Sequence, residues 1–371
     1  MLNGEILSQD RVVAQVKNNR RTVIDPDHCP LYLRKYDDVK GWLIRRSIDA
    51  HRTNSRLLRK ALRLAPNDDL GAVLRVHGAT ITDSYWYREE GETLTYDKVR
   101  FGKENPFSQL ALRGDPDSFR LGSAGAVTPE LTNTGSFEKC WENHDGVWWM
   151  IKAGNDLEQF SELFVYRLGD LLGLPMAHYE RDGGYIRSKD FTEGRYDFEP
   201  AYGVMLEEED YVENYHRFRE ICPRAAALYV GMVYLDGLVA NMDRHTNNYG
   251  FLRDQETGEL LTLAPLFDHN IALVARGYPS SSLNRGGMLN KDFADLLKEE
   301  PQALKDFLSL GLTPPTESIV REAARQANDP PFSQGTVRED FLVEFVMSAH
   351  EWIEDQVQGL LPIQEDFEVT R

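Results

Sequence analysis

Residues 241–248 read NMDRHTNN, and residues 266–268, a short distance further along the chain, read LFD. Phosphoryl transfer needs a carboxylate that faces the attacking hydroxyl group, and it needs oxygen ligands for Mg²⁺. Asp243 suits the first task, and Asn248 and Asp268 suit the second. The two stretches therefore predict the catalytic loop and the metal-binding loop of an ATP-dependent kinase.

The segments around these loops agree with that prediction. Residues 224–238, RAAALYVGMVYLDGL, have the composition and spacing of a largely buried helix. Residues 249–252 and 260–266 read as two strands on either side of a glycine-bearing turn. A helix, a polar loop, a hairpin and a metal carboxylate follow one another in this order in the C-lobe of a kinase. In the alternative interpretation the Asp, His and Asn residues only cap turns, but the second carboxylate at a suitable distance weakens it.

A nucleotide-phosphate site is predicted upstream of this region. Residues 132–139, TNTGSFEK, are mostly small and polar, and a glycine lets the backbone approach a phosphate group. The residues expected at the phosphates are Thr134, Gly135 and Ser136. Residues 147–152, VWWMIK, read as a strand that ends on Lys152, which would contact the α- and β-phosphates. The loop is neither G-x-G-x-x-G nor a Walker A sequence, so an ordinary turn is the alternative interpretation.

The next helix supplies a partner for the lysine. Apolar residues recur at helical spacing over residues 160–172, and Glu162 lies at the edge of that apolar stripe. It can turn inward and pair with Lys152, which would hold the lysine against the phosphates. A solvated surface glutamate is the alternative, but the order strand, lysine, helix, glutamate favours the pair. Two short strands and a hinge for the adenine, at residues 188–191, are expected to follow.

From about residue 128 to residue 275 the chain resembles the HipA family of bacterial serine/threonine kinases, the toxin halves of certain toxin–antitoxin pairs. The stretches that carry the likeness are Gly135 to Lys139, Ile151-Lys152, the helix with Glu162 that runs to Pro175, residues 186–191, and the loops at 243–248 and 264–268. The form Asp-Arg-His-x-x-Asn is also similar to the catalytic loop of lipid kinases of the phosphatidylinositol type.

This resemblance implies an α+β fold of the bilobal protein-kinase type, with a small antiparallel β lobe, a mainly helical lobe and an N-terminal mixed α/β extension. It implies ATP and Mg²⁺ as cofactors and transfer of the γ-phosphate to a protein hydroxyl. Members of the family can be silenced by autophosphorylation in the phosphate loop. The position in register is Thr132, with Thr134 and Ser136 close by. The resemblance also suggests an antitoxin or regulatory partner at the N-terminal region.

Three parts of the chain are expected from these elements. Residues 1–120 would form an N-terminal mixed domain, with a basic helical part and then aromatic-rich strands, one of them over residues 79–87. Residues 121–190 would form the kinase N-lobe with the phosphate loop. Residues 191–371 would form the helical C-lobe, whose last helices are expected at 290–312, 317–328 and 338–361. The first 120 residues do not resemble the N-terminal region of the best-known family members.

The net charge of −18, from 42 basic and 60 acidic residues, makes direct binding of nucleic acid unfavourable. Residues 1–75 nevertheless hold 15 Lys or Arg against 9 Asp or Glu. Within them residues 42–64 read as a basic helix or helix pair, which either docks a partner or keeps a solvated basic face. Three separated cysteines, no apolar run long enough for a bilayer and no signal-peptide h-region predict a cytoplasmic protein without a membrane segment.

The roles expected are therefore as follows. Asp243 orients the acceptor hydroxyl and takes its proton, while His245 shapes the loop through hydrogen bonds. Asn248 and Asp268 hold Mg²⁺, and Lys152, fixed by the helix glutamate, neutralises the phosphates. Two rival hypotheses stay open. One is a small-molecule or lipid kinase with the same loops, and the other is a catalytically silent kinase-like module that binds a partner.

Overall fold

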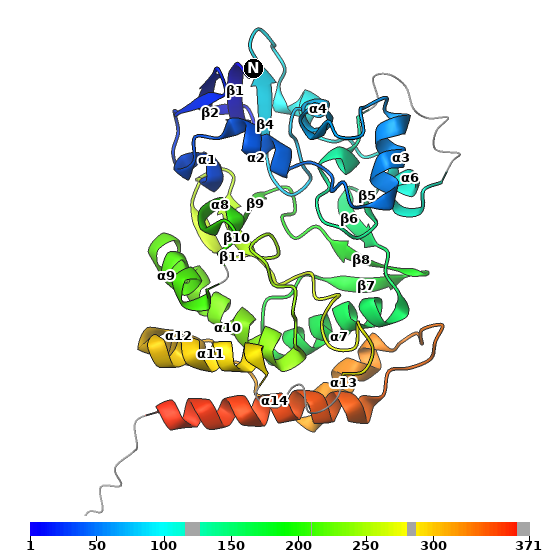
Figure 1. Cartoon of the computed structure of the whole chain (residues 1–371), viewed down its shortest axis with the longest axis vertical. Helices are drawn as coiled ribbons and strands as arrows, with labels where there is room; N and C mark the ends of the chain where they lie inside the picture. Colours follow the sequence, from blue (N-terminus) through cyan, green and yellow to red (C-terminus); the bar gives the residue numbers. More distant parts are fainter. Residues whose placement is uncertain (116–126, 209, 280–286, 362–371) are drawn as a thin grey trace, which may run out of the picture.

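The structure is a computed structural model that describes residues 1–115, 127–208, 210–279 and 287–361. The strands of these residues form three antiparallel sheets, which follow one another along the chain (Figure 1). The first sheet lies within the expected N-terminal part, the second within the expected N-lobe and the third within the expected C-lobe. The boundary expected between residues 120 and 121 lies outside the described residues.

The first sheet belongs to the N-terminal region, residues 1–115. Its strand order is β3-β2-β1-β4, and a core of apolar side chains such as Ile6, Val13 and Trp42 lies against it. The strands are β1 (Gly4–Ser8), β2 (Arg11–Lys17), β3 (Arg20–Val23) and β4 (Tyr85–Glu89). The helices are α1 (Leu31–Lys35), α2 (Val39–Arg45), α3 (Thr53–Ala61), α4 (Asp69–Leu74), α5 (Tyr96–Val99) and α6 (Ser108–Arg113).

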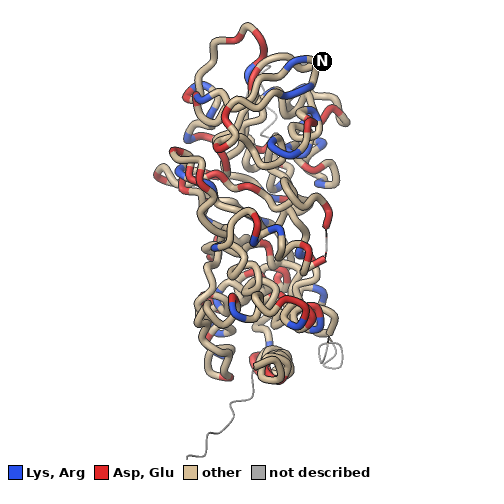
Figure 2. Tube along the Cα trace, turned by 90° about the vertical axis from the view of Figure 1, so that its left-hand side faces the viewer, with Lys and Arg blue, Asp and Glu red and all other residues tan. Residues whose placement is uncertain are grey.

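Two expectations for this region need correction. The strand expected over residues 79–87 begins only at Tyr85, because residues 79–84 form an irregular segment with a bend at 81–82, and residues 80–83 line the cavity described below. The basic segment 42–64 forms the end of α2 and the whole of α3, so of the two forms expected the helix pair is present, but its basic face is only partly solvated, since Arg52 and Arg59 are 1% exposed. Figure 2 shows basic and acidic residues interspersed in this part of the molecule.

The second sheet has the order β5-β6-β8-β7 and carries the expected hairpin. Its strands are β5 (Lys139–His144), β6 (Val147–Lys152), β7 (Tyr179–Asp182) and β8 (Tyr185–Lys189). Between β6 and β7 runs α7 (Asp156–Leu172), which begins with a capping box formed by Asn155 and Glu158 and ends at Gly173 in the left-handed conformation. Lys139 and Lys152 are directly opposite each other across β5 and β6, so their side chains leave the same face.

The third sheet, of order β11-β10-β9, lies beside the helical layer (Figure 1). Its strands are β9 (Tyr196–Pro200), β10 (Gly250–Asp254) and β11 (Leu260–Leu263). The helices are α8 (Tyr202–Met205), α9 (Tyr211–Ile221), α10 (Pro223–Val239), α11 (Met288–Glu299), α12 (Pro301–Ser309), α13 (Glu317–Ala327) and α14 (Glu339–Leu360). The central α10 is buried along most of its length, as its sequence predicted. One helix was expected over residues 290–312, but Pro301 begins a new one because it has no N–H for a continuing helix.

None of the helices in the described ranges is long and apolar enough to cross a membrane.

Candidate active site

A cavity of about 730 Å³ opens between the N-terminal region, the second sheet and the loops that follow α10. All but one of the residues predicted from the sequence to act at the phosphates, the metal or the acceptor line it. They are Thr132, Thr134, Gly135, Ser136, Lys152, Asp243, Asn248 and Asp268. Glu162, the exception, is fully buried directly behind Lys152.

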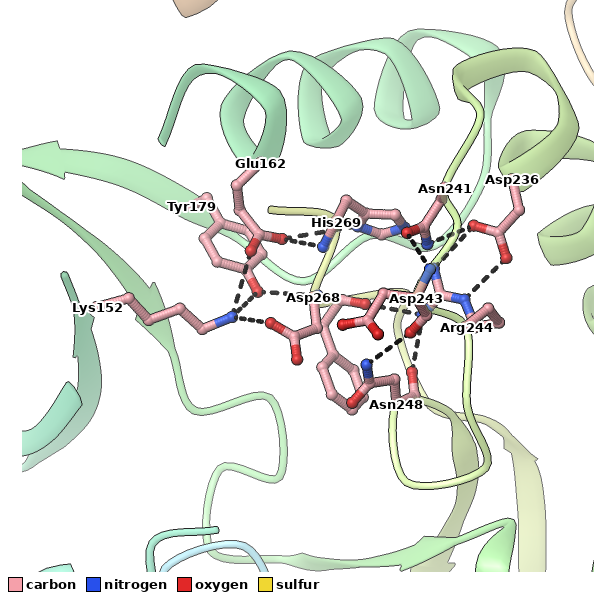
Figure 3. Close-up of polar contacts among 11 residues, drawn as sticks. Lys152, Glu162, Tyr179, Asp236, Asn241, Asp243, Arg244, Asn248, Asp268 and His269 are labelled. Atoms are coloured by element: carbon pink, nitrogen blue, oxygen red, sulfur yellow. Dashed lines mark hydrogen bonds and ion pairs between the residues drawn. The ribbon is translucent and has the colours of Figure 1, made fainter. Parts of the chain in front are cut away.

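Lys152 is the centre of a buried polar cluster (Figure 3). Its Nζ lies 2.8 Å from Oδ1 of Asp268, 3.3 Å from Oε2 of Glu162 and 3.1 Å from the hydroxyl oxygen of Tyr179. Burial by itself would lower the pKa of Lys152, but the two carboxylates outweigh it and hold that pKa well above its usual range. The lysine is therefore a fixed cation at one wall of the cavity.

Glu162 joins α7 to the loop after the third sheet. Its Oε1 accepts a hydrogen bond of 2.8 Å from the backbone N–H of His269, while its other oxygen faces Lys152. The preceding residue, Asp268, has a φ of +64°, a left-handed conformation that Asp tolerates better than most residues. Burial opposes ionisation of Asp268, but Lys152 and Lys139 hold the pKa of its carboxyl well below its usual range. Asp268 is thus ionised at neutral pH.

Arg244 connects the two loops that the sequence singled out. It forms a two-point ion pair with Asp236 of α10, with Nε 2.8 Å from Oδ2 and Nη2 3.0 Å from Oδ1. Its Nη1 also donates to the carbonyl oxygens of Asn248 and Phe267, each at 2.9 Å. Both charged side chains of the pair are at most 2% exposed. This pair was not predicted from the sequence, although Asp236 is the one acidic residue in a largely apolar helix, where a buried acid needs a partner.

Asp243 lies half-buried at the cavity wall. In the described part of the chain no hydrogen bond reaches its carboxylate, whereas its backbone carbonyl accepts a 3.0 Å bond from Nδ2 of Asn248. Burial and the neighbouring Asp268 raise the pKa of Asp243, although nearby cationic groups oppose this. His245 is exposed and accepts from the backbone N–H of Asn247 at 3.3 Å. An available carboxylate therefore faces the cavity.

The segment predicted as the phosphate loop, residues 132–139, has an exposed centre and a buried start. Thr134, Gly135 and Ser136 are exposed to the cavity, and Gly135 has a φ of +96°, which a side chain would strain. Thr132, by contrast, is buried, and its hydroxyl donates to the carbonyl oxygen of Ala79 at 2.6 Å. A phosphoryl group can reach Thr132 only after this bond has broken.

Lys139 was not singled out as a site residue, although it ends the stretch that resembles the HipA phosphate loop. It lines the cavity, and its Nζ lies so close to Gly135 that a Cβ there would be 2.4 Å away. Among the described residues its Nζ has no hydrogen-bond or ion-pair partner. Burial and the nearby Lys152 lower its pKa to about 8, against the attraction of Asp268. The sequence feature that could have identified Lys139 is its position opposite Lys152 in the predicted hairpin.

The oxygen ligands at the cavity suit Mg²⁺ better than they suit a metal ion that is bound by protein side chains alone. Within the described ranges no group of three or more His, Cys, Asp or Glu side chains could hold a metal ion. Mg²⁺ is usually held by one or two protein carboxylates together with substrate phosphates and water. The carboxylate of Asp268 and the amide of Asn248, both at the cavity, fit that pattern.

Comparisons with known proteins bear on the fold. No protein-family profile and no curated protein matches the chain. Among solved structures, the toxin–antitoxin complex of HipA, HipB and operator DNA from Shewanella oneidensis MR-1 matches at a TM-score of 0.60 and 11% identity, over 97% of this chain and 100% of that chain. The Helicobacter pylori proinflammatory kinase CtkA matches at a TM-score of 0.41 and 19% identity, over 60% of this chain and 93% of that chain. The predicted α+β, bilobal kinase-like architecture is confirmed, and the chain has the fold of HipA.

Proposed function

We propose that this protein is an ATP-dependent serine/threonine protein kinase of the HipA type. The observation that carries the proposal is Lys152, held by Glu162 and Asp268 at the wall of a cavity whose other polar groups include Asp243. A lysine, a helix glutamate, a metal carboxylate and a free carboxylate are the parts that phosphoryl transfer uses. The HipA fold, which extends over 97% of this chain, supports the same function.

The residues would divide the work as follows. Lys152 neutralises the α- and β-phosphates, and the exposed loop residues Thr134 to Ser136 cover the γ-phosphate with backbone N–H groups. Asn248 and Asp268 would hold Mg²⁺, which when bound neutralises charge on the phosphates of ATP. Asp243 orients the acceptor hydroxyl and takes its proton. Apolar side chains for the adenine are available in the same cavity from Met150, Phe191, Phe198 and Phe267.

The acceptor is proposed to be a protein hydroxyl. The sequence Asp-Arg-His-x-x-Asn at residues 243–248 also suggests a small-molecule or lipid acceptor. However, Arg244 of that motif is buried and bound to Asp236, so its side chain does not contact an acceptor. We further propose that a protein partner binds at the N-terminal region, as HipB accompanies HipA in the Shewanella complex. The net charge of −18 favours a protein over direct contact with nucleic acid.

Incubation of the purified chain with Mg²⁺ and γ-labelled ATP tests the proposal. We expect label on protein, lost with a metal chelator, and mapped by mass spectrometry to Thr134 or Ser136 or to an added protein. Label on Thr132 would mean that its bond to Ala79 opens during catalysis. If label appeared only in lipid or metabolite fractions, the acceptor would be a lipid or a small molecule and not a protein. Absence of both label and ATP binding would contradict the kinase assignment and favour the silent module.

Lys139→Met provides a prediction about the phosphate site. Because charge-assisted hydrogen bonds contribute roughly 1.5–3 kcal/mol, we expect the Kd for Mg·ATP to rise about tenfold or more. The melting temperature should stay the same or rise, since Lys139 is a partly buried cation without a partner in the described residues. Calorimetric titration and thermal unfolding measure the two quantities. Lys189→Met is the control, because Lys189 lines the same cavity but pairs with Glu193 at 3.1 Å. Unchanged ATP affinity in Lys139→Met would exclude this role.

A further inference from the structure

The N-terminal region contacts the phosphate loop at its start. The backbone N–H of Ile48 donates to the carbonyl oxygen of Leu131 at 2.9 Å. The side chain of Leu131 is fully buried in a cluster with Ile48, Leu58 and Phe107 from the N-terminal region. The next residue, Thr132, bonds to Ala79 as described above. The loop therefore leaves from a point that is built into the N-terminal region.

Arg52 contacts the loop at both ends. This residue precedes α3, and its side chain is fully buried. Its Nη1 donates to the carbonyl oxygen of Asn133 at 3.1 Å, and its Nη2 donates to that of Lys139 at 2.5 Å. The exposed loop centre lies between these two acceptors. A guanidinium group is planar and presents its donors in a rigid fork, so it sets the distance between the two ends of the loop.

Glu138 adds a second link between α3 and the loop. Its Oε1 accepts from the backbone N–H of Asn54 at 3.1 Å, and its Oε2 lies 3.7 Å from Nε of Arg52. Nε itself has no hydrogen-bond partner in the described residues. The hydrogen bonds of Arg52 go to two neutral carbonyl oxygens, whereas its carboxylate neighbours, Glu138 at 3.7 Å and the buried Glu130, balance its charge without a hydrogen bond in the described part of the chain. The directed bonds of Arg52 therefore fix the loop rather than neutralise the charge of the guanidinium group.

We propose that Arg52 is a positioning residue for the phosphate loop, and that the N-terminal region is therefore a structural part of the nucleotide site. The proposal rests on the function proposed above. Figure 1 shows that α3 and α6 of the N-terminal region lie beside the second sheet. Apolar residues of α6, Ala111 and Leu112, pack against Cys140 and Ile151 of that sheet. The N-terminal region thus supports the hairpin as well as the loop.

The test compares ATP with adenosine in Arg52→Ala and Arg52→Lys. Adenosine lacks the phosphates, so its affinity does not depend on the loop. Because small misplacements of a binding group have large effects, we expect the Kd for Mg·ATP to rise about 10- to 100-fold while that for adenosine changes less than about twofold. The KM for ATP should rise in parallel. Lys cannot supply two fixed donors, so Arg52→Lys should lose most of the same affinity.

Arg253→Ala is the matched control. Arg253 is equally buried and also joins the N-terminal region to the rest of the chain, through the carbonyl oxygens of Asp27 and Cys29 and an ion pair with Glu199. It does not contact the phosphate loop, so the ratio of ATP to adenosine affinity should stay at the wild-type value. Circular dichroism checks that each variant folds, and Arg52→Lys, which keeps the buried charge, decides the question if Arg52→Ala does not fold.

The outcomes separate this inference from the proposed function. Wild-type protein that binds neither ATP nor adenosine would overturn the function, and the inference with it. Wild-type protein that binds ATP, together with folded Arg52 variants that bind ATP equally well, would overturn the inference alone. If Arg253→Ala lowered the ratio of ATP affinity to adenosine affinity by the same factor as the Arg52 variants, the inference would also be wrong. The effect would then come from general destabilisation.

Discussion

Replacement of Asp243 by Asn is expected to lower kcat for phosphoryl transfer by about 10²- to 10⁴-fold, the usual contribution of a positioned general base. The variant keeps the shape of the side chain but loses its ability to accept a proton. The affinity for Mg·ATP should change little, because the phosphates contact the lysine and the loop on the other wall of the cavity. Stability should not fall, since in the described part of the chain no hydrogen bond reaches the Asp243 carboxylate. Single-turnover kinetics with labelled ATP, alongside calorimetric binding, measure both effects.

Asn247→Ala is the control for that experiment. Asn247 is an exposed residue of the same loop and also lines the cavity. It has no proposed role in proton transfer, so kcat should stay within a few-fold of wild type. If Asp243→Asn transferred phosphate at the wild-type rate, the assignment of Asp243 as the proton acceptor would be wrong.

Replacement of Asp236 by Ala is expected to lower the free energy of unfolding by about 3–5 kcal/mol, the range found when one partner of a buried ion pair is removed. Arg244 would stay buried with its charge no longer paired, because the pair is at most 2% exposed. Activity should also fall, because Arg244 donates hydrogen bonds to the carbonyl oxygens of Asn248 and Phe267, one in each of the two loops of the proposed site. Denaturant unfolding followed by circular dichroism measures the change.

Two further variants sharpen this prediction. Asp170→Ala removes an exposed acid from α7 and should change stability by no more than about 0.5 kcal/mol. In the double variant Asp236→Ala/Arg244→Met both charges are gone, and much of the lost stability should return. A single Asp236→Ala variant as stable as Asp170→Ala would show that the ion pair does not stabilise the loops.

The local patterns in the sequence predicted the elements that surround the site. The apolar run at 224–238, the hairpin before Lys152 and the amphipathic stretch after it all form the expected elements. In each, the hydrophobic pattern and the turn residues agree with the tertiary structure, which makes local interpretation reliable. The inward orientation of Glu162 was also predicted, from the order of the elements, and the structure excludes a solvated surface position.

Other parts could not be predicted locally. The first three strands, before residue 24, were not identified. The strand β9 was not identified either. It contains two charged residues, Asp197 and Glu199, that the structure buries. Their partners, such as the Ser84 hydroxyl on Asp197 and the Arg253 guanidinium on Glu199, are far away in sequence. Charged residues in a strand resemble a surface segment until those partners are known.

By itself the sequence predicted the kind of chemistry that we propose, because the predicted catalytic and metal-binding loops are short segments in which the residue types and their spacing already indicate a function. Only the tertiary structure decided which side chains complete the site. It buries Thr132 against Ala79, places Lys139 at the cavity without a hydrogen-bond or ion-pair partner in the described residues, and brings Arg52 from the N-terminal region onto the phosphate loop. The reason is physical: burial and pairing of polar groups depend on contacts between segments distant along the chain, which no local pattern records.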